Sequence, residues 1–253
     1  MKIQRKDEII KVLSESRVVK AAELAASFGV SMETIRRDLA ELEQEGVVRR
    51  THGGAILNVG YSIEPDYGER EMKNFEEKRQ IGRKAVSMVD DGDTIIIDIG
   101  TSTLEFAKML KGKKKVTVLT NSLIIALILI DDPDIKVIVF GGEARHGEGT
   151  TSGFWAEEMV DGFYVDKLFL GVGAMTVEEG VMDYDIPETN LRRHYIRHSK
   201  LVIALADYSK FGIKALNVVC GTEKLDYLVT DGKTDQRILR DLKDHGVEVL
   251  VAH

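Results

Sequence analysis

Apolar residues follow two different periodicities along the chain, and the change between them divides it. In residues 1–57 they recur every three or four positions in three segments, which is the spacing of amphipathic helices. The third segment begins after Ser31, which can cap a helix, and ends at Gly46. Residues 47–57 then predict two short strands joined by the turn Gly53–Gly54. The helical stripes consist of Ile9 and Leu13, of Leu24 and Phe28, and of Ile35, Leu39 and Leu42.

From Asp93 onward, short apolar runs alternate with helical segments. This alternation predicts an α/β domain with a mostly parallel sheet and helices on both faces. The run LIIALILI (Leu123–Ile130) suits a strand by composition, but its place between two clearer strands favours a helix. The predicted strands are TIIIDI, VTVLTN, IKVIVFGG, KLFLGVGA, KLVIALAD, YLVTD and VEVLVA, and the other predicted helices are STLEFAKML, 156–160, 188–198 and 235–244.

Residues 58–75 separate the two patterns. They contain Gly60, Pro65 and Gly68 and show no sustained periodicity, so we predict a linker, with a helix from about Glu76 to Val89. The expected organisation is therefore a small helical domain with a hairpin at 1–57, a linker at 58–75 and an α/β domain at 76–253.

Composition limits the protein class. With 43% hydrophobic and 30% charged residues the chain is typical of a soluble globular protein. Its longest apolar run has eight residues, whereas a bilayer-spanning helix needs about 20. The start MKIQRKDEII lacks the apolar core of a signal peptide. The single Cys220 excludes an internal disulfide and argues against a cysteine-based metal site. We expect a cytoplasmic protein without metal, cofactor or membrane contact.

Charge distribution leaves room for a nucleic-acid site. The net charge of −7 divides into +1 for residues 1–57 and −8 for the remainder. The order helix, tight turn and second helix is that of a helix-turn-helix, whose second helix enters the major groove of DNA. Arginine can bind guanine bidentately, and serine or threonine can contact phosphate or base edges. The candidate DNA-contacting residues are Lys20, Ser31, Glu33, Thr34, Arg36, Arg37, Arg49, Arg50, His52 and Gly53.

A plainer interpretation of this helix exists. Glu33 with Arg37, and Arg37 with Glu41, stand four residues apart and could simply be ion pairs on a solvated face. The combination of three helices, a capped second helix, adjacent arginines and a glycine-turned basic hairpin favours DNA.

Polar residues and glycines follow the predicted strands. Asp98 and then Gly100, Thr101, Ser102 and Thr103 lie where a strand passes into a helix, whose unpaired N–H groups attract anions. The ends of parallel strands share one edge, where ligands of open α/β sheets bind. The loop lacks the glycines of a dinucleotide or nucleoside-triphosphate motif, so we expect a phosphorylated small molecule. Other strand ends offer Asn121 and Ser122, Gly141 and Gly142, and Gly173.

Further polar candidates come from two later segments. Asp183, Asp185 and Glu188 could accept hydrogen bonds from sugar hydroxyls, and Lys210 could neutralise a phosphate. Each of these features also suits a surface loop, a capped turn or a solvated lysine. Trp155 and His146 could lie near the same edge, although a core or loop role suits them better.

Two sets of motifs resemble one protein family. The segment ELAASFGVSMETIRRDLAELEQEGVVRRTHGGA is similar to the winged helix-turn-helix of the DeoR family of bacterial transcriptional regulators. The segments DIGTST, TNS, GG, GVGA and DYSKFG resemble, in order, the effector-pocket segments of the same family. The resemblance implies a C-terminal domain with the fold of sugar-phosphate isomerases. It also implies ligand contacts by Asp98, Thr101, Thr103, Asn121, Gly173 and Lys210.

The expected function is repression of a carbohydrate-catabolism operon, with release from double-stranded operator DNA by a phosphorylated sugar. Binding a palindromic operator requires a homo-oligomer, either a dimer or a tetramer. We assign no catalytic residues. One alternative is a sugar-phosphate isomerase-like enzyme in which Asp98, Asp183, Glu188 and Lys210 transfer protons. Another is an α/β domain that only dimerises.

Overall fold

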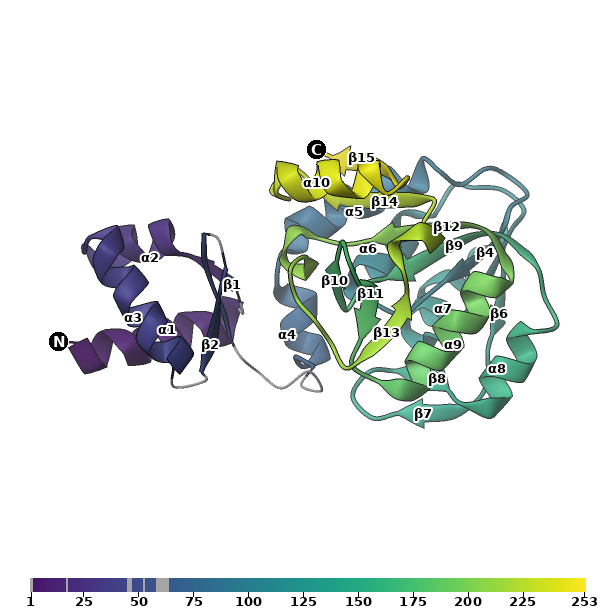
Figure 1. Ribbon diagram of the computed structural model, residues 1–253. Coiled ribbons are helices and arrows are strands. Elements are labelled where there is room, and N and C mark those ends of the chain that lie inside the picture. Colours follow the sequence, from purple (N-terminus) through teal and green to yellow (C-terminus); the bar gives the residue numbers. More distant parts are fainter. Residues whose placement is uncertain (1, 17, 45–46, 52, 58–63) are drawn as a thin grey trace. The chain divides into compact units, whose positions relative to one another are not determined.

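The computed structural model describes residues 2–16, 18–44, 47–51, 53–57 and 64–253. The chain forms two compact units, Met1–Ile63 and Glu64–His253. We call them the N-terminal and the C-terminal unit and describe each by itself (Figure 1).

The N-terminal unit packs three helices against a small sheet. The helices are α1 (Lys2–Ser16), α2 (Ala21–Phe28) and α3 (Met32–Gln44). The strands β1 (Val18–Lys20), β2 (Val48–Thr51) and β3 (Gly54–Leu57) pair antiparallel in the order β1-β3-β2. The predicted hairpin is thus confirmed, whereas β1 was not predicted. The helical stripes form the core, in which Ile9, Leu13, Leu24, Ile35, Leu39 and Leu42 are buried and Phe28 is partly buried.

The two glycines of the hairpin turn, Gly53 and Gly54, have different surroundings. Gly54 begins the central strand β3, and a Cβ there would lie 1.7 Å from the carbonyl oxygen of Val19 on β1. Gly53 faces open space, and its carbonyl oxygen accepts a hydrogen bond from the Ala21 N–H at 2.8 Å. Only glycine at position 54 therefore lets β1 pair with β3.

Of the segment predicted as a linker, the structure describes residues 64–75, and residues 58–63 lie outside the described residues. The stretch 64–75 belongs to the C-terminal unit and contains the helix α4 (Tyr67–Met72), and the next helix, α5, spans Phe75–Val86. Helix α4 buries none of its residues, so no apolar stripe marks it in the sequence. Tyr67 is partly buried against the core, and polar contacts also hold the segment, such as the 3.0 Å hydrogen bond from Arg70 Nε to the Pro65 carbonyl oxygen.

The core of the C-terminal unit is a seven-stranded sheet in which every neighbouring pair is parallel. The strand order is β15-β14-β12-β9-β4-β5-β6. The strands are β4 (Thr94–Ile97), β5 (Val116–Thr120), β6 (Ile135–Val139), β9 (Val165–Gly171), β12 (Ser199–Leu205), β14 (Tyr227–Asp231) and β15 (Glu248–Ala252). All seven predicted strands are confirmed.

Helices cover both faces of this sheet. One face carries α5, α6 (Thr101–Met109) and α7 (Leu123–Leu129), which confirms the helical interpretation of LIIALILI. The other carries α8 (Phe154–Val160), α9 (Ile186–Arg197) and α10 (Gln236–Asp244). Successive residues of β4 serve the two cores in turn, with Ile95 and Ile97 on one side and Ile96 on the other. Among the described residues, no helix is both long and apolar enough to cross a bilayer.

Two small antiparallel sheets were missed by the sequence interpretation. One is the hairpin of β7 (Glu143–Arg145) and β8 (Thr150–Ser152), and the other joins β10 (Ala174–Thr176), β11 (Gly180–Asp183) and β13 (Asn217–Cys220). Short 3-10 turns follow at Tyr208–Lys210 and Thr222–Lys224. Strands of three or four residues are too short to show an alternating pattern.

Candidate DNA-contacting surface and effector site

The start of helix α3 presents polar side chains to solvent. Ser31 Oγ accepts a hydrogen bond from the Thr34 N–H at 3.2 Å, which confirms Ser31 as the cap, and lies 2.9 Å from Thr34 Oγ1. Glu33, Arg36 and Arg37 are exposed. Arg36 lies 3.9 Å from Glu33, a weak surface contact. Within the described part of the chain Arg37 has no ion-pair partner, so its guanidinium is available to a ligand.

Helix α3 is fixed from its other side by ion pairs with α1 that the sequence interpretation did not predict. Asp38 is fully buried and accepts a 2.6 Å hydrogen bond from Arg5 Nε on α1. Glu41 pairs with Lys6 at 2.8 Å and not, as considered from the sequence, with Arg37. These two contacts hold α3 against α1 while its first turn stays open.

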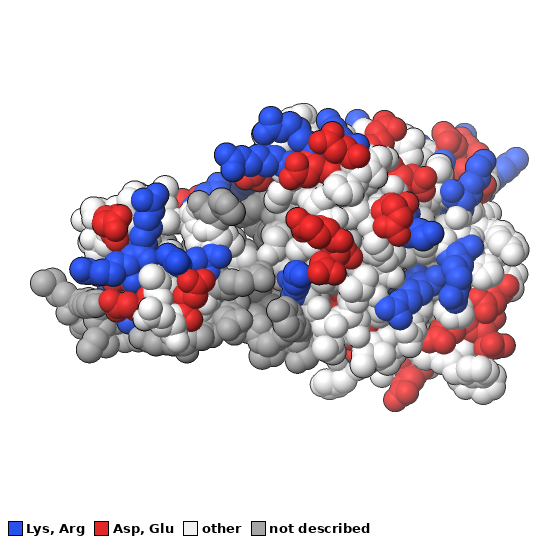
Figure 2. Space-filling view, in the orientation of Figure 1, with Lys and Arg blue, Asp and Glu red and all other residues white. Residues whose placement is uncertain are grey.

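The hairpin candidates divide into different environments. Arg50 donates to Glu43 through its backbone N–H at 2.8 Å and its Nε at 2.7 Å, so it braces β2 against α3. These hydrogen bonds lower the pKa of Glu43. Lys20 is exposed at the end of β1, 3.8 Å from Glu23, and Gly53 is exposed in the turn. The side chain of Arg49 and the whole of His52 lie outside the described residues. Figure 2 shows basic side chains gathered on this unit with acidic ones around them.

The second candidate site lies at the topological switch point of the large sheet. The chain runs outward from β4 through β5 and β6, then returns to the other side of β4 with β9. Ligands of open α/β sheets bind at such points, outside the carboxyl ends of the strands. Asp98 follows β4 there, and its Oδ2 accepts a 3.0 Å hydrogen bond from the N–H of Gly171 at the end of β9.

The loop that follows β4 leads directly into α6. Gly100 has φ 147°, and no side chain caps the helix, so the first-turn N–H groups remain without a side-chain acceptor. Thr101, Ser102 and Thr103 are buried at this turn. Thr103 Oγ1 donates to the Gly100 carbonyl oxygen at 2.9 Å, so this hydroxyl shapes the loop.

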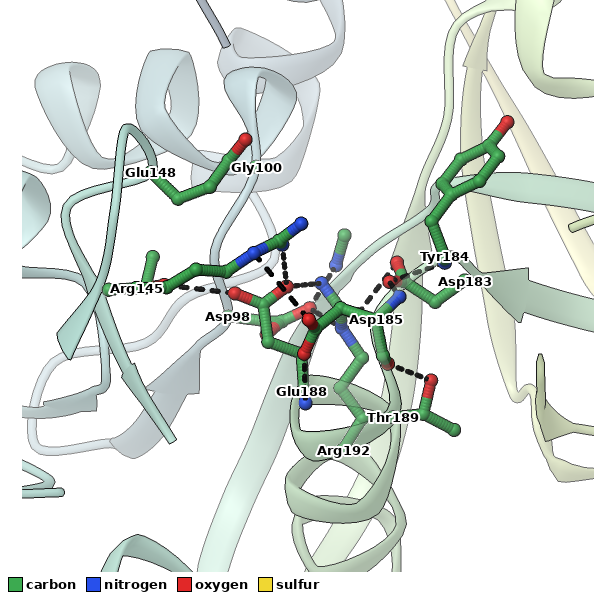
Figure 3. A network of polar contacts seen from close by, with 12 residues as sticks. Asp98, Gly100, Arg145, Glu148, Asp183, Tyr184, Asp185, Glu188, Thr189 and Arg192 are labelled. Atoms are coloured by element: carbon green, nitrogen blue, oxygen red, sulfur yellow. Dashed lines mark hydrogen bonds and ion pairs between the residues drawn. The ribbon is translucent and has the colours of Figure 1, made fainter. Parts of the chain in front are cut away.

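A buried arginine occupies the centre of the site (Figure 3). Arg192 Nε donates to Asp98 Oδ2 at 2.7 Å. Its Nη1 lies 2.7 Å from Asp183 Oδ2 without the angle of a hydrogen bond, and its Nη2 lies 4.0 Å from Glu188. Burial raises the pKa of Asp98, and burial raises the pKa of Glu188 to about 7. Arg192 was missed by the sequence interpretation, although it stands four residues after Glu188 on the same helix face.

A second guanidinium, Arg145 of β7, borders this centre. Its Nη1 donates to Glu188 at 3.0 Å, its Nη2 donates to Glu64 at 2.7 Å, and its Nε lies 3.6 Å from Asp185. Asp185 also caps α9 through the Glu188 N–H at 3.0 Å. Asp183, Asp185 and Glu188 are thus brought together beside Arg145 and Arg192, and their contacts with sugar hydroxyls stay a prediction.

The remaining strand-end candidates are partly structural. Ser122 Oγ caps α7 at 3.2 Å from the Ile125 N–H. A Cβ on Gly142 would lie 2.4 Å from the Ser152 carbonyl oxygen, and one on Gly173 would lie 2.8 Å from Asp183 Oδ2. Gly141 donates its N–H to Met159 Sδ at 3.3 Å. Gly142 and Gly173 thus leave room for close neighbours, and ligand contacts at these positions stay a prediction.

Asn121 differs from its neighbours. Its Nδ2 donates to the Thr151 carbonyl oxygen at 2.9 Å, while its buried Oδ1 has no hydrogen-bond partner among the described residues. A buried acceptor without a partner is uncommon in folded proteins.

Two lysines complete the positive charge of the site. Burial lowers the pKa of Lys210. The nearby carboxylates Asp207, Glu64 and Asp183 partly offset this effect, whereas the positive charge of Arg70 adds to it. In the described part of the chain no carboxylate forms an ion pair with its Nζ. Lys78, which the sequence interpretation missed, is buried with a pKa lowered to about 8 by burial and donates to the carbonyl oxygens of Arg70 and Lys73.

Other candidates lie apart from this network. Trp155 is exposed on α8 beside Phe154, and His146 is exposed between β7 and β8. Cys220 is buried. Across the residues that the structure describes, no group of three or more His, Cys, Asp or Glu side chains is arranged to hold a metal ion.

Comparison with known proteins covers both units. Residues 5–59 match the family model described as a DeoR-like helix-turn-helix domain, and residues 73–232 match that of the DeoR C-terminal sensor domain. The HTH-type transcriptional regulator GolR of Listeria innocua serovar 6a is 32% identical over 249 residues, 98% of each chain. The glycerol-3-phosphate regulon repressor of Escherichia coli K12 is 31% identical over 246 residues, 97% of each chain.

Solved structures resemble part of the chain more weakly. Ribose 5-phosphate isomerase A from Neisseria gonorrhoeae has 19% sequence identity and a TM-score of 0.40, over 55% of this chain and 54% of that one.

Proposed function

We propose a function from one premise: the chain belongs to the DeoR family of transcriptional regulators. Its relatives are named as transcriptional regulators or repressors, so it is a regulator rather than an enzyme, and the isomerase-like alternative is set aside. We propose that it represses a carbohydrate-catabolism operon, leaves the operator when a phosphorylated sugar binds, and acts in the cytoplasm. No cofactor enters this proposal.

The observation that carries the effector proposal is a set of polar groups at one sheet edge that have no ion-pair or side-chain hydrogen-bond partner among the described residues. The Lys210 ammonium and the uncapped start of α6 attract an anion, while Asn121 Oδ1 accepts a hydrogen bond from a hydroxyl. A phosphorylated polyol carries both kinds of group. The name of the E. coli relative, a glycerol-3-phosphate regulon repressor, supports the same class of ligand.

A thermal-shift panel tests this proposal. Each phosphorylated sugar, and glycerol 3-phosphate, is compared with its unphosphorylated form, because a ligand of the folded state adds about 2.7 kcal/mol at 100 times its Kd. Replacing Lys210 by Met is expected to remove the shift. Lys214→Met, on a lysine that pairs with Glu179, is the matched control and should keep it. Equal shifts with free sugars would contradict an anion site.

For the DNA-contacting surface we propose that α3 enters the major groove. Arg37 is exposed and has no ion-pair partner among the described residues, and one base-contacting arginine contributes about 1–3 kcal/mol. Arg37→Ala is therefore expected to weaken binding to a selected duplex about tenfold or more, whereas Arg83→Ala, in the C-terminal unit, should not. Equal affinities of both variants would exclude Arg37 from the interface.

For the homo-oligomer we propose that α7 packs against a second copy. Its outer residues Leu123, Leu127 and Ile130 are 40%, 72% and 63% exposed, although the helix carries no polar side chain. A helix that is apolar all round is normally buried, and two operator half-sites need two DNA-contacting units. Leu127→Asp is expected to give monomers in sedimentation, whereas Arg240→Asp on α10 should not. Unchanged assembly of Leu127→Asp would exclude this face.

The link between ligand and operator must be differential binding. A phosphorylated sugar releases DNA only if it favours an arrangement of the assembly that does not match the operator; equal affinity for both arrangements changes nothing.

A further inference from the structure

We propose that Arg145 is a counter-ion shared between the effector site and the first residue of the C-terminal unit, so that an anion in the site competes with Glu64 for it. This inference rests on the proposed function, because it takes the effector to be anionic. We call the three residues involved the Glu64–Arg145–Glu188 bridge.

The bridge consists of direct hydrogen bonds from one guanidinium. Arg145 Nη2 donates to Glu64 Oε2 at 2.7 Å, and Nη1 donates to Glu188 Oε2 at 3.0 Å. Glu188 lies 4.0 Å from Arg192 and accepts a 2.9 Å hydrogen bond from Thr150 Oγ1. Glu64 is thus one side chain away from the centre of the site (Figure 3 shows Arg145, Glu188 and Arg192).

The β7–β8 hairpin holds the same segment a second time. Arg70 lies 3.2 Å from Glu64 and pairs with Glu148, which stands between β7 and β8. Arg70 also donates to the Pro65 carbonyl oxygen at 3.0 Å. The start of the C-terminal unit is therefore tied by charged hydrogen bonds to elements that border the site, in addition to the packing of Tyr67 against the core.

Arg145 is the arginine that a ligand can reach. Its side chain is 26% exposed, whereas that of Arg192 is 4% exposed and is enclosed by Asp98 and Asp183. A guanidinium binds phosphate bidentately, in the same way that it binds carboxylates. A phosphate that enters the site can thus bind the Arg145 guanidinium in place of Glu64.

Loss of Arg145 changes the position of Glu64. The Glu64 side chain is only 12% exposed, and a mostly buried carboxylate that loses its nearest donor is costly unless it turns toward water. Glu64 is joined to Leu57 of β3 by residues 58–63 in the chain. Glu64 is the point at which the chain enters the C-terminal unit. Its contact with Arg145 therefore determines the position of this point, and loss of the contact changes that position. By linkage, loss of the Glu64 contact also strengthens anion binding.

Hydrogen exchange of the full chain tests the proposal, with inorganic phosphate as the probe. The reporter is a peptide covering residues 64–73, and thermal shift reports phosphate binding. Phosphate should raise exchange in this peptide of the wild type. Glu64→Gln should show raised exchange without phosphate and bind phosphate about threefold to tenfold more tightly, the upper value being about 1.4 kcal/mol. Glu69→Gln, at an exposed glutamate of α4, should behave as the wild type.

Two variants of Arg145 distinguish loss of its positive charge from a general effect on folding. Arg145→Gln should raise hydrogen exchange at residues 64–73 and abolish its response to phosphate. Arg145→Lys keeps the positive charge but lacks the bidentate guanidinium, so its exchange should lie between that of the wild type and that of Arg145→Gln. If phosphate stabilises the wild type but leaves exchange at 64–73 unchanged, the shared counter-ion is wrong and the anion site stands. If phosphate has neither effect, the anion site fails and the bridge proposal with it. Glu64→Gln with wild-type exchange and wild-type phosphate affinity would also overturn it.

Discussion

Replacement of Arg192 by Met removes the positive centre of the effector site and keeps most of the side-chain volume. Asp98 and Asp183, each 2.7 Å from the guanidinium and almost fully buried, lose their counter-ion. Breaking a buried ion pair by removing one partner costs about 3–5 kcal/mol. At about 2–4 °C per kcal/mol for a unit of this size, the melting temperature should fall by roughly 10 °C.

The pH dependence of this loss gives a second check. Burial already raises the pKa of Asp98, and removal of Arg192 raises it further. An acid whose folded-state pKa lies above the unfolded value of about 3.9 is destabilising once pH exceeds that value. The deficit should therefore be larger at pH 8 than at pH 5. Thermal unfolding of Arg192→Met is compared with that of Arg193→Met, on the exposed neighbour. Equal melting temperatures, or a deficit independent of pH, would refute the reasoning.

Three further outcomes are expected. Gly54→Ala should destabilise the N-terminal unit by about 1–3 kcal/mol or more in urea, because its Cβ overlaps the Val19 carbonyl, while Gly53→Ala in open space should not. Glu188 has a pKa raised to about 7, so the stability of the wild type should decline from about pH 4.5 to pH 7. Glu188→Gln should lack this part of the decline when unfolding is measured at a series of pH values. Parallel pH profiles of the two proteins would contradict this. Asp38→Asn, which weakens a buried contact to α1, should cost about 1–3 kcal/mol, and wild-type unfolding would exclude it.

The sequence predicts the large sheet well because its strands are buried on both sides. Runs such as TIIIDI carry enough apolar residues to be recognised alone, and their alternation with helices leaves a parallel sheet as the arrangement. Even LIIALILI was assigned correctly from its place in that order. The edge that holds Asp98 and Asn121 followed from the same topology.

Elements with few buried apolar residues could not be predicted in this way. Helix α4 has no buried residue, and the β7–β8 hairpin is too short for a periodic signal. From the sequence alone, Arg192 is expected to be a solvated cation on a helix. Its buried role becomes visible only when the structure places Asp98, 94 positions earlier in the chain, beside it. Glu64 appeared as part of a linker for the same reason, since its partner Arg145 is 81 positions away. Long-range ion pairs leave no local pattern.

The measurement that tests the central claim most directly is competition between a phosphorylated sugar and DNA. Fluorescence anisotropy follows the full chain on a labelled duplex selected from a random pool, at one fixed salt concentration because the affinity depends on salt. We predict that the phosphorylated compound that raises the melting temperature also releases the DNA, that its unphosphorylated form does not, and that Lys210→Met stays bound. A stabilising sugar phosphate that leaves DNA binding unchanged would contradict the account.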